Sequence, residues 1–191
     1  MRRKNFGNCA ERIVGAQDES LRNDSAGMVK IIGIDPGLAS TGVGIICGME
    51  NKIHSYSYTS INTSKKDSLP NRLNEIFVNI RNILRAEKPD IMVVEDIFSL
   101  SRHPMSGITL GKVVGILLLA GRRADMPVVE VPVREAKKIL TGNGNSTKIQ
   151  LETAVRRILN LKDPIRPYHA SDAMGLSLIG FYRYSTDFHG K

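Results

Sequence analysis

The pattern of apolar and polar residues predicts alternating strands and helices from residue 28 onward. Three apolar or alternating stretches, over 29–34, 42–46 and 52–61, are joined by short connections that are typical of antiparallel hairpins. Apolar residues then recur at helical spacing over 68–87, and Pro89 follows this helix. The first half of this region therefore predicts a three-stranded antiparallel unit followed by a helix.

The remaining chain continues the alternation. Residues 91–94 form a wholly apolar run, as expected for a buried central strand, and 127–131 predicts another short strand. Three hairpin strands followed by alternating helices and strands predict an α/β fold, in which helices flank a mixed sheet with antiparallel and parallel strands. The helices are expected over 104–123, 132–140, 147–160 and 168–183.

The residues before Met28 have a different character. Residues 1–27 are polar and weakly periodic, and no apolar stretch follows the basic start, so this region is not a secretory signal. We expect it to be a disordered tail or the product of a start codon placed too far upstream. A length of 191 residues suits one domain. We place that domain over 28–184, followed by a tail over 185–191.

Composition excludes several classes of protein. With 41% hydrophobic and 24% charged residues, the chain has enough apolar side chains to form a core. The longest apolar run, over 113–120, is too short to cross a bilayer, so we expect no membrane association. The two cysteines, Cys9 and Cys47, have neither metal-ligand spacing nor a disulfide framework. These features predict a cytoplasmic protein.

The distribution of charge points to a polyanionic partner. The chain carries 27 Lys and Arg against 19 Asp and Glu, a formal net charge of +8. Residues 134–167 alone hold eight basic residues against three acidic ones. Nucleic acid is the commonest polyanion that such a segment binds, and a solvated basic helix face is the alternative.

Two acidic residues end apolar strands. Asp35 follows the strand over 29–34, and Glu95 follows the run over 91–94. If these strands are neighbours, the two carboxylates meet at one edge of the sheet, where a divalent cation would relieve their repulsion. Oxygen ligands without a nearby cysteine favour Mg²⁺ or Mn²⁺ over Zn²⁺. The alternatives are that Asp35 is a turn former before Pro36-Gly37 and that Glu95 is a surface charge at a strand end.

A third polar element opens the last predicted helix. His169 and Asp172 lie three residues apart and would share one helix face. Alternatively, Asp172 is a first-turn acid favoured by the helix dipole, with His169 near the cap. Taken together, the three elements predict a site for two divalent ions, which is typical of phosphoryl transfer. In a basic chain this suggests a nuclease, with His169 as a ligand or a proton-transfer group.

Several segments resemble the RuvC-type Holliday junction resolvases, in order and in spacing. The similar segments are Ile31-Ile32-Gly33-Ile34-Asp35-Pro36-Gly37 with Thr41-Gly42-Val43-Gly44, Val94-Glu95-Asp96-Ile97-Phe98, Gly111-Lys112-Val113-Val114-Gly115, Arg134-Glu135-Ala136-Lys137, Thr141-Gly142-Asn143-Gly144 with Lys148, and His169-Ala170-Ser171-Asp172-Ala173. The resemblance covers about residues 28–183.

The resemblance implies a ribonuclease H-like fold and a homodimer. Each subunit would nick one of two like-oriented strands of a four-way DNA junction with Mg²⁺, during recombination and repair. Partnership with the RuvA–RuvB branch-migration machine is implied in the same way. By position, Asp35, Glu95, His169 and Asp172 would form the catalytic metal site. The residues implied in DNA contact are Phe98, which would stack on a junction base, and Lys112, Arg134, Lys137 and Lys148.

One position varies within the family. Many members carry Asp where this chain has His169, which removes one negative charge from the predicted site. Three other interpretations stay open at this point. They are a junction-binding scaffold without catalysis, an actin-like kinase, whose opening resembles Asp35-Pro36-Gly37 but whose length is about double, and a nuclease that acts on structured RNA.

Overall fold

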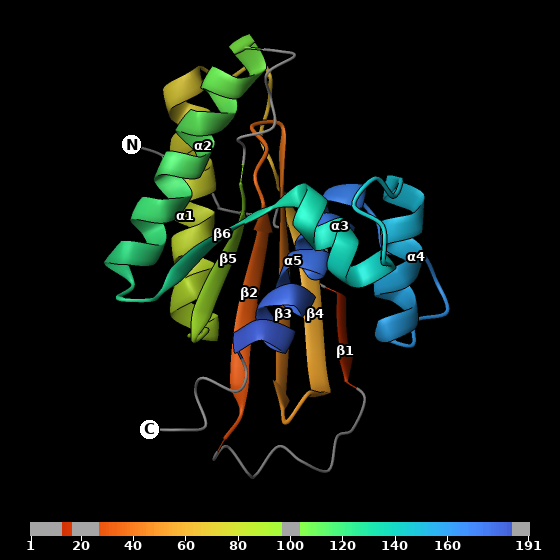
Figure 1. The fold of residues 1–191 in the computed structure, drawn as a ribbon. Coiled ribbons are helices and arrows are strands. Elements are labelled where there is room, and N and C mark those ends of the chain that lie inside the picture. The colour runs from red at the N-terminus through yellow and green to blue at the C-terminus, as the bar shows by residue number, and fades with distance from the viewer. Residues whose placement is uncertain (1–12, 17–26, 97–103, 185–191) are drawn as a thin grey trace.

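The structure, a computed structural model, describes residues 13–16, 27–96 and 104–184. Figure 1 shows a central sheet with helices on both faces. The elements in chain order are β1 (Ile13–Ala16), β2 (Val29–Asp35), β3 (Ser40–Met49), β4 (Lys52–Asn62), α1 (Leu69–Glu87), β5 (Ile91–Asp96), α2 (Pro104–Arg123), β6 (Val128–Pro132), α3 (Val133–Thr141), α4 (Lys148–Ile158) and α5 (Tyr168–Tyr184).

The sheet is mixed, as the sequence predicts. Its six strands lie in the order β1-β4-β3-β2-β5-β6. The β2, β3 and β4 strands pair antiparallel, whereas β5 and β6 run parallel to β2. The expected meander followed by parallel strands is therefore confirmed.

The described part of residues 1–27 departs from the expectation of disorder. Ile13–Ala16 forms β1 and pairs antiparallel with β4, in the register Ile13↔Tyr58 to Ala16↔Ser55. Two β-branched residues, Ile13 and Val14, give this short stretch some preference for a strand. In addition, without β1 the strand β4 would be an edge strand, and its unpaired N–H and C=O groups form hydrogen bonds with this short stretch.

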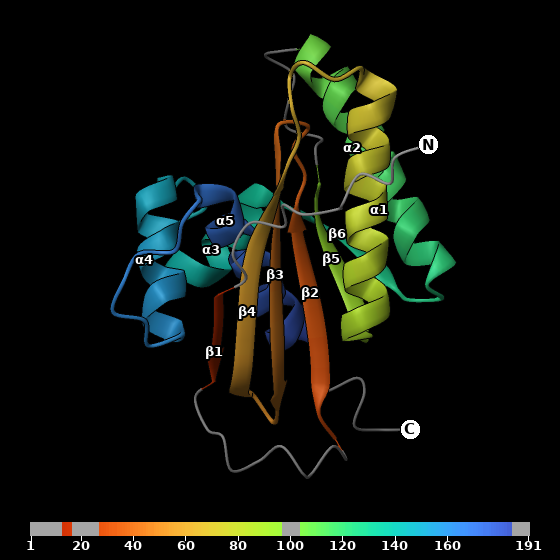
Figure 2. The ribbon, with the colours of Figure 1, turned by 180° about the vertical axis from the view of Figure 1, so that it is seen from behind.

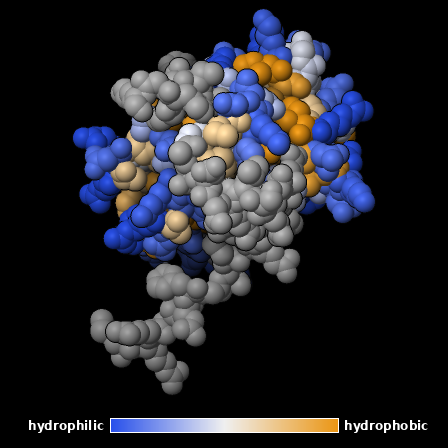
Figure 3. Space-filling model, turned by 90° about the horizontal axis from the view of Figure 1, so that it is seen from below, coloured by the Kyte–Doolittle hydropathy of each residue, from blue (hydrophilic) through white to orange (hydrophobic). Residues whose placement is uncertain are grey.

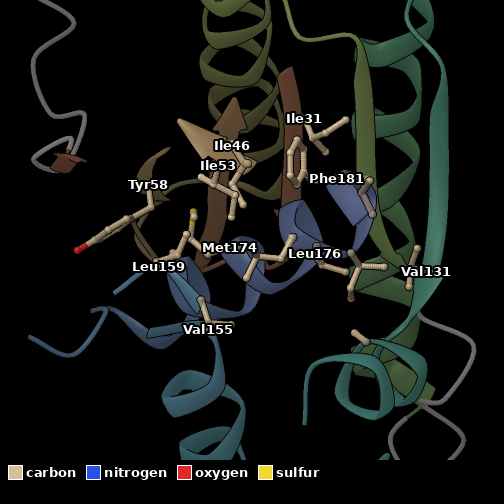
Figure 4. Close-up of a cluster of buried hydrophobic side chains, with 14 of the residues drawn as sticks. Ile31, Ile46, Ile53, Tyr58, Val131, Val155, Leu159, Met174, Leu176 and Phe181 are labelled. Atoms are coloured by element: carbon tan, nitrogen blue, oxygen red, sulfur yellow. The ribbon is translucent and has the colours of Figure 1, made fainter. Parts of the chain in front are cut away.

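Two apolar layers hold the helices against the sheet, and Figure 2 shows the second face from behind. Because strand side chains alternate between faces, β2 contributes Ile31 to one layer and Ile32 to the other. The layer drawn in Figure 4 packs α5 and α4 on the sheet, and the opposite layer packs α1 and α2. Members of the first layer include Ile31, Ile46, Val155, Met174 and Phe181, and members of the second include Ile32, Ile76, Ile80, Met92, Val94 and Leu117.

The surface is mostly hydrophilic around the rim of the view in Figure 3, with smaller hydrophobic areas between. Among the residues that the structure describes, no helix combines the length and the hydropathy needed to span a bilayer.

Candidate active site

The parallel pairing of β2 with β5 sets Asp35 beside Glu95. Ile34 is the register partner of Val94, so Asp35 and Glu95 follow one step later on neighbouring strands. Side chains two or four residues apart on a strand lie on the same face, so Asp35 lies on the face of Ile31 and Glu95 on the face of Val93, both of which face α5. A hydrogen bond joins the Asp35 and Glu95 side chains. The expected meeting of two carboxyl groups at one edge of the sheet is therefore present.

Glycines let the N-terminal part of α5 approach the backbone of the sheet directly. A Cβ atom on Gly42 of β3 would lie 1.9 Å from the carbonyl oxygen of His169, and one on Gly33 of β2 would lie 2.3 Å from that of Ala173. Any larger residue would therefore push α5 away. This close packing holds His169 and Asp172, both in the first turns of α5, over the end of β2.

His169 contacts Asp35 directly. Its Nδ1 atom lies 2.5 Å from Oδ2 of Asp35, whose side chain is only 8% exposed. The hydrogen bond to Asp35 raises the pKa of His169, and this effect outweighs burial, which lowers it. The contact therefore favours the imidazolium form of His169 and gives the buried Asp35 carboxylate a compensating partner.

Burial and neighbouring acids strongly perturb the other two carboxyl groups. Burial is the main cause that raises the pKa of Glu95 to about 9, and the hydrogen bond and charge of Asp35 add to it. The pKa of Asp172 is also raised, first by burial and then by the charge of Asp35. The raised pKa of Glu95 favours its protonated form at neutral pH, in which its carboxyl group donates the hydrogen bond to Asp35.

Lys148, the first residue of α4, joins this acidic cluster of Asp35, Glu95, His169 and Asp172. Its Nζ atom lies 3.3 Å from Oδ2 of Asp172. Desolvation lowers the pKa of Lys148, but the charges of Asp172, Asp35 and Glu95 outweigh it, so the net shift is upward. The sequence suggests only a DNA-binding role for Lys148, and its contact with Asp172 is a finding of the structure.

The donor atoms of the cluster suit a divalent cation. Three carboxyl groups and one imidazole supply mainly hard oxygen ligands, which Mg²⁺ and Mn²⁺ prefer. The side chains are not arranged as a ready coordination shell, since no three His, Cys, Asp or Glu side chains form one within 13–16, 27–96 and 104–184. Instead they bind one another and Lys148. Raised pKa values and the contact with Lys148 both show that this buried group of acids attracts positive charge, which suits it to binding a cation.

The residues predicted to contact DNA lie in several parts of the molecule. Lys112 on α2 and Arg134 on α3 are exposed, and Lys137 on α3 is half-buried. These three side chains take no part in the described ion pairs of the acidic cluster. Phe98 lies outside the described residues.

A second network, not predicted from the sequence, holds the turn after Asp35. Thr41 donates a hydrogen bond from Oγ1 to the carbonyl oxygen of Gly37 at 2.8 Å. Thr63 donates from Oγ1 to the carbonyl oxygen of Leu38 at 2.5 Å and accepts a hydrogen bond from Nε of Arg72 at 2.8 Å. The Thr-Gly pair after Asp35-Pro36-Gly37 gives a hint of the first bond, but no local pattern links Thr63 with Leu38, 25 residues away.

Known proteins share both the sequence and the fold. The family model "Crossover junction endodeoxyribonuclease RuvC" matches residues 31–179. A protein of that name from Carboxydothermus hydrogenoformans is 37% identical over 155 residues, which cover 81% of this chain and 97% of that protein. Another, from Rhodopirellula baltica, is 35% identical over 169 residues, covering 88% of this chain and 94% of that protein.

Among solved structures, RuvC of Thermus thermophilus in complex with a Holliday junction substrate is similar, with a TM-score of 0.76 and 26% identity. The match covers 83% of this chain and 96% of that one. The mixed sheet with helices on both faces is accordingly a ribonuclease H-like fold. The extent of the family match and the identity to these relatives show that the chain belongs to the RuvC family of crossover junction endodeoxyribonucleases.

Proposed function

We propose that this chain resolves four-way DNA junctions by metal-dependent hydrolysis, with the acidic cluster as its active site. The observation that carries this proposal is the convergence of β2, β5 and α5, which brings together Asp35, Glu95, His169 and Asp172. RuvC enzymes are metal-dependent nucleases, and the donor set of the cluster supports Mg²⁺, with Mn²⁺ as a substitute and two ions per site. These enzymes act in recombination and DNA repair, which fits a cytoplasmic location for this chain.

When bound, divalent cations would activate water for attack on phosphorus and stabilise the leaving oxygen. The residues of the chain have separate tasks. Asp35, Glu95 and Asp172 would hold the cations through their oxygens, and Glu95 would give up its proton for this purpose. His169 orients Asp35 through the contact at Nδ1 and would serve as a ligand or move a proton. Cleavage would leave 5′-phosphate and 3′-hydroxyl ends.

Basic residues would bind the phosphates of the junction. Lys112, Arg134, Lys137 and Lys148 supply positive charge from α2, α3 and α4, and Phe98 would stack on a base at the crossover. Selectivity should come mainly from the shape of the junction, with modest preference for sequence.

Paired nicking requires two active sites, so we propose a homodimer. Exposed residues on one face of α2 support a contact between copies. Ile108 is 56% exposed and Leu119 is 47% exposed, and the exposed Gly115 lies between them at helical spacing. A second copy would cover these apolar side chains, with Gly115 allowing close approach of the helices. Partnership with RuvA and RuvB is proposed on family membership.

The test compares a labelled four-way junction with a duplex and a structured RNA of matched length. The chain should nick the junction symmetrically in Mg²⁺ and leave it intact in EDTA. Asp35→Asn should reduce the cleavage rate by at least about 100-fold, while junction affinity measured in EDTA stays within about threefold, because the basic contacts remain. Cleavage by Asp35→Asn at the parent rate would show that the site is assigned wrongly, and preferential cleavage of RNA would show that the substrate is.

A further inference from the structure

We propose that Lys148 is an internal counter-ion of the acidic cluster, which a divalent cation displaces and thereby releases to bind a DNA phosphate. This inference rests on the proposed function, because it takes the cluster as the cation site. It adds a consequence of its own, namely that cation binding and DNA binding reinforce each other through one side chain.

The ion pair between Lys148 and Asp172 is of a kind that can break readily. The Nζ atom of Lys148 lies 3.3 Å from Oδ2 of Asp172, which is an ordinary distance for an ion pair. The Lys148 side chain is 61% exposed, whereas that of Asp172 is 14% exposed. The lysine therefore reaches from solvent to the rim of a buried acidic group, and its stem is free to turn outward.

The electrostatic role of Lys148 extends beyond this one pair. Its charge also acts on Asp35 and Glu95, so it faces the whole group of carboxyl side chains. Lys148 occupies the first position of α4, after the N-cap Thr147, where the helix dipole disfavours a positive charge. Carboxylates are thus what stabilise the ammonium group in this position when no other ion is present.

A divalent cation at the same carboxylates would change that balance. The cation neutralises the charge that attracts Lys148 and repels the ammonium group directly. Lys148 would then turn toward solvent, where a phosphate of bound DNA provides a new partner. Because linkage is reciprocal, DNA that captures Lys148 must tighten cation binding by the same factor by which the cation tightens DNA binding.

The first experiment measures cation binding without DNA or cleavage. Mn²⁺ is titrated into the full-length protein, and the free ion is followed by electron paramagnetic resonance. Lys148→Met should bind Mn²⁺ about three- to tenfold more tightly than the parent, because a competitor for the carboxylates is gone. Lys138→Met, which removes an exposed lysine of α3, is the matched control and should stay within about twofold. Lys148→Arg keeps the charge and should resemble the parent.

The second experiment measures the coupling to DNA. Junction affinity is determined by fluorescence anisotropy, with and without Mn²⁺, on a junction protected from cleavage by central phosphorothioate linkages. The gain in affinity caused by Mn²⁺ should be at least about threefold larger for the parent than for Lys148→Met. Should Lys148→Met fail to fold, as judged by circular dichroism, Lys148→Gln provides the same comparison.

The outcomes separate this inference from the proposed function. If the parent binds no Mn²⁺, or if Asp35→Asn binds it equally well, the metal site itself is wrong. If the parent binds Mn²⁺ at the cluster but Lys148→Met binds no more tightly, or no more tightly than Lys138→Met, the counter-ion role is refuted and the active site stands.

Discussion

Gly42→Ala tests whether the packing of α5 on β3 sets the geometry of the acidic cluster. The added Cβ atom would lie 1.9 Å from the carbonyl oxygen and 2.4 Å from the carbonyl carbon of His169. Real Cβ atoms essentially never approach other heavy atoms within 3.0 Å. Both contacted atoms belong to the backbone, so no change of rotamer relieves the clash. The first turn of α5 must therefore move by about 1 Å, and His169 moves with it.

The expected loss of rate and the expected loss of stability are of similar size in free energy, because a factor of 100 in rate corresponds to about 2.7 kcal/mol. Overpacking of this kind costs about 1–3 kcal/mol in the free energy of unfolding. A displacement of about 1 Å in a group that positions a reaction lowers the rate about 100-fold. Junction affinity should fall by less than about threefold, because the basic residues of α2 and α3 do not depend on this contact. The measurements are single-turnover cleavage of a labelled junction, urea denaturation and fluorescence anisotropy.

Gly48→Ala provides a matched control at the other end of β3. There the new Cβ atom would lie 2.3 Å from the carbonyl oxygen of Lys52 and 2.6 Å from Cζ of Phe181. Gly48 pairs with Val29 at the start of β2, whereas Gly42 pairs with Asp35 at its end. This variant should lose comparable stability but cleave at nearly the parent rate once folded. Parent-like cleavage by folded Gly42→Ala, or an equal loss of rate in Gly48→Ala, would refute the reasoning.

Two further predictions concern proton binding and assembly. In EDTA, the free energy of unfolding should fall as pH rises from about 4.5 to about 9. Burial and Asp35 raise the pKa of Glu95 to about 9 in the folded state. Over this pH range the folded state therefore keeps a proton that the unfolded state has released. The slope is at most about 1.4 kcal/mol per pH unit for each such proton, and Glu95→Gln should flatten it in urea titrations. A rise in stability over this range would contradict the raised pKa of Glu95. Ile108→Glu should weaken the proposed dimer at least about tenfold in sedimentation equilibrium, whereas Ile149→Glu, at a 64% exposed position of α4, should not. Dimers of unchanged affinity would exclude the exposed face of α2 as the contact.

Much of the fold follows from local patterns in the sequence. The helical spacing of apolar residues predicts α1, and the observed helix begins only one residue later than predicted. The helix predicted over 104–123 has the observed bounds of α2. The strand predicted over 42–46 is extended to Ser40–Met49, because hydrogen bonding to β2 and β4 continues past the apolar run. Local periodicity identifies elements, but their ends depend on pairing with distant segments.

The sequence predicts which residues form the candidate site, but it does not predict the contacts among them. Acids at the ends of two buried strands indicate that Asp35 and Glu95 meet, because parallel neighbours end at the same edge. Nothing local indicates that Lys148 pairs with Asp172, since that depends on how α4 packs beside α5. The raised pKa of Glu95 is likewise a property of burial and neighbours. The strand at Ile13–Ala16 escaped prediction because its pairing with β4 provides the decisive interactions.

The contacts within the acidic cluster explain how one chain can keep three carboxyl groups together before any cation binds. Repulsion and desolvation would otherwise oppose folding. The raised pKa values of Glu95 and His169 favour their protonated forms, and these forms, together with the ammonium group of Lys148, reduce the negative charge of the cluster. None of these compensations is permanent, since a proton dissociates and a lysine side chain turns away. The fold can therefore be stable without the ion. If the cluster binds a cation as proposed, the affinity includes the cost of releasing a proton and a lysine, so that part of its control lies in Lys148, which would not coordinate the ion.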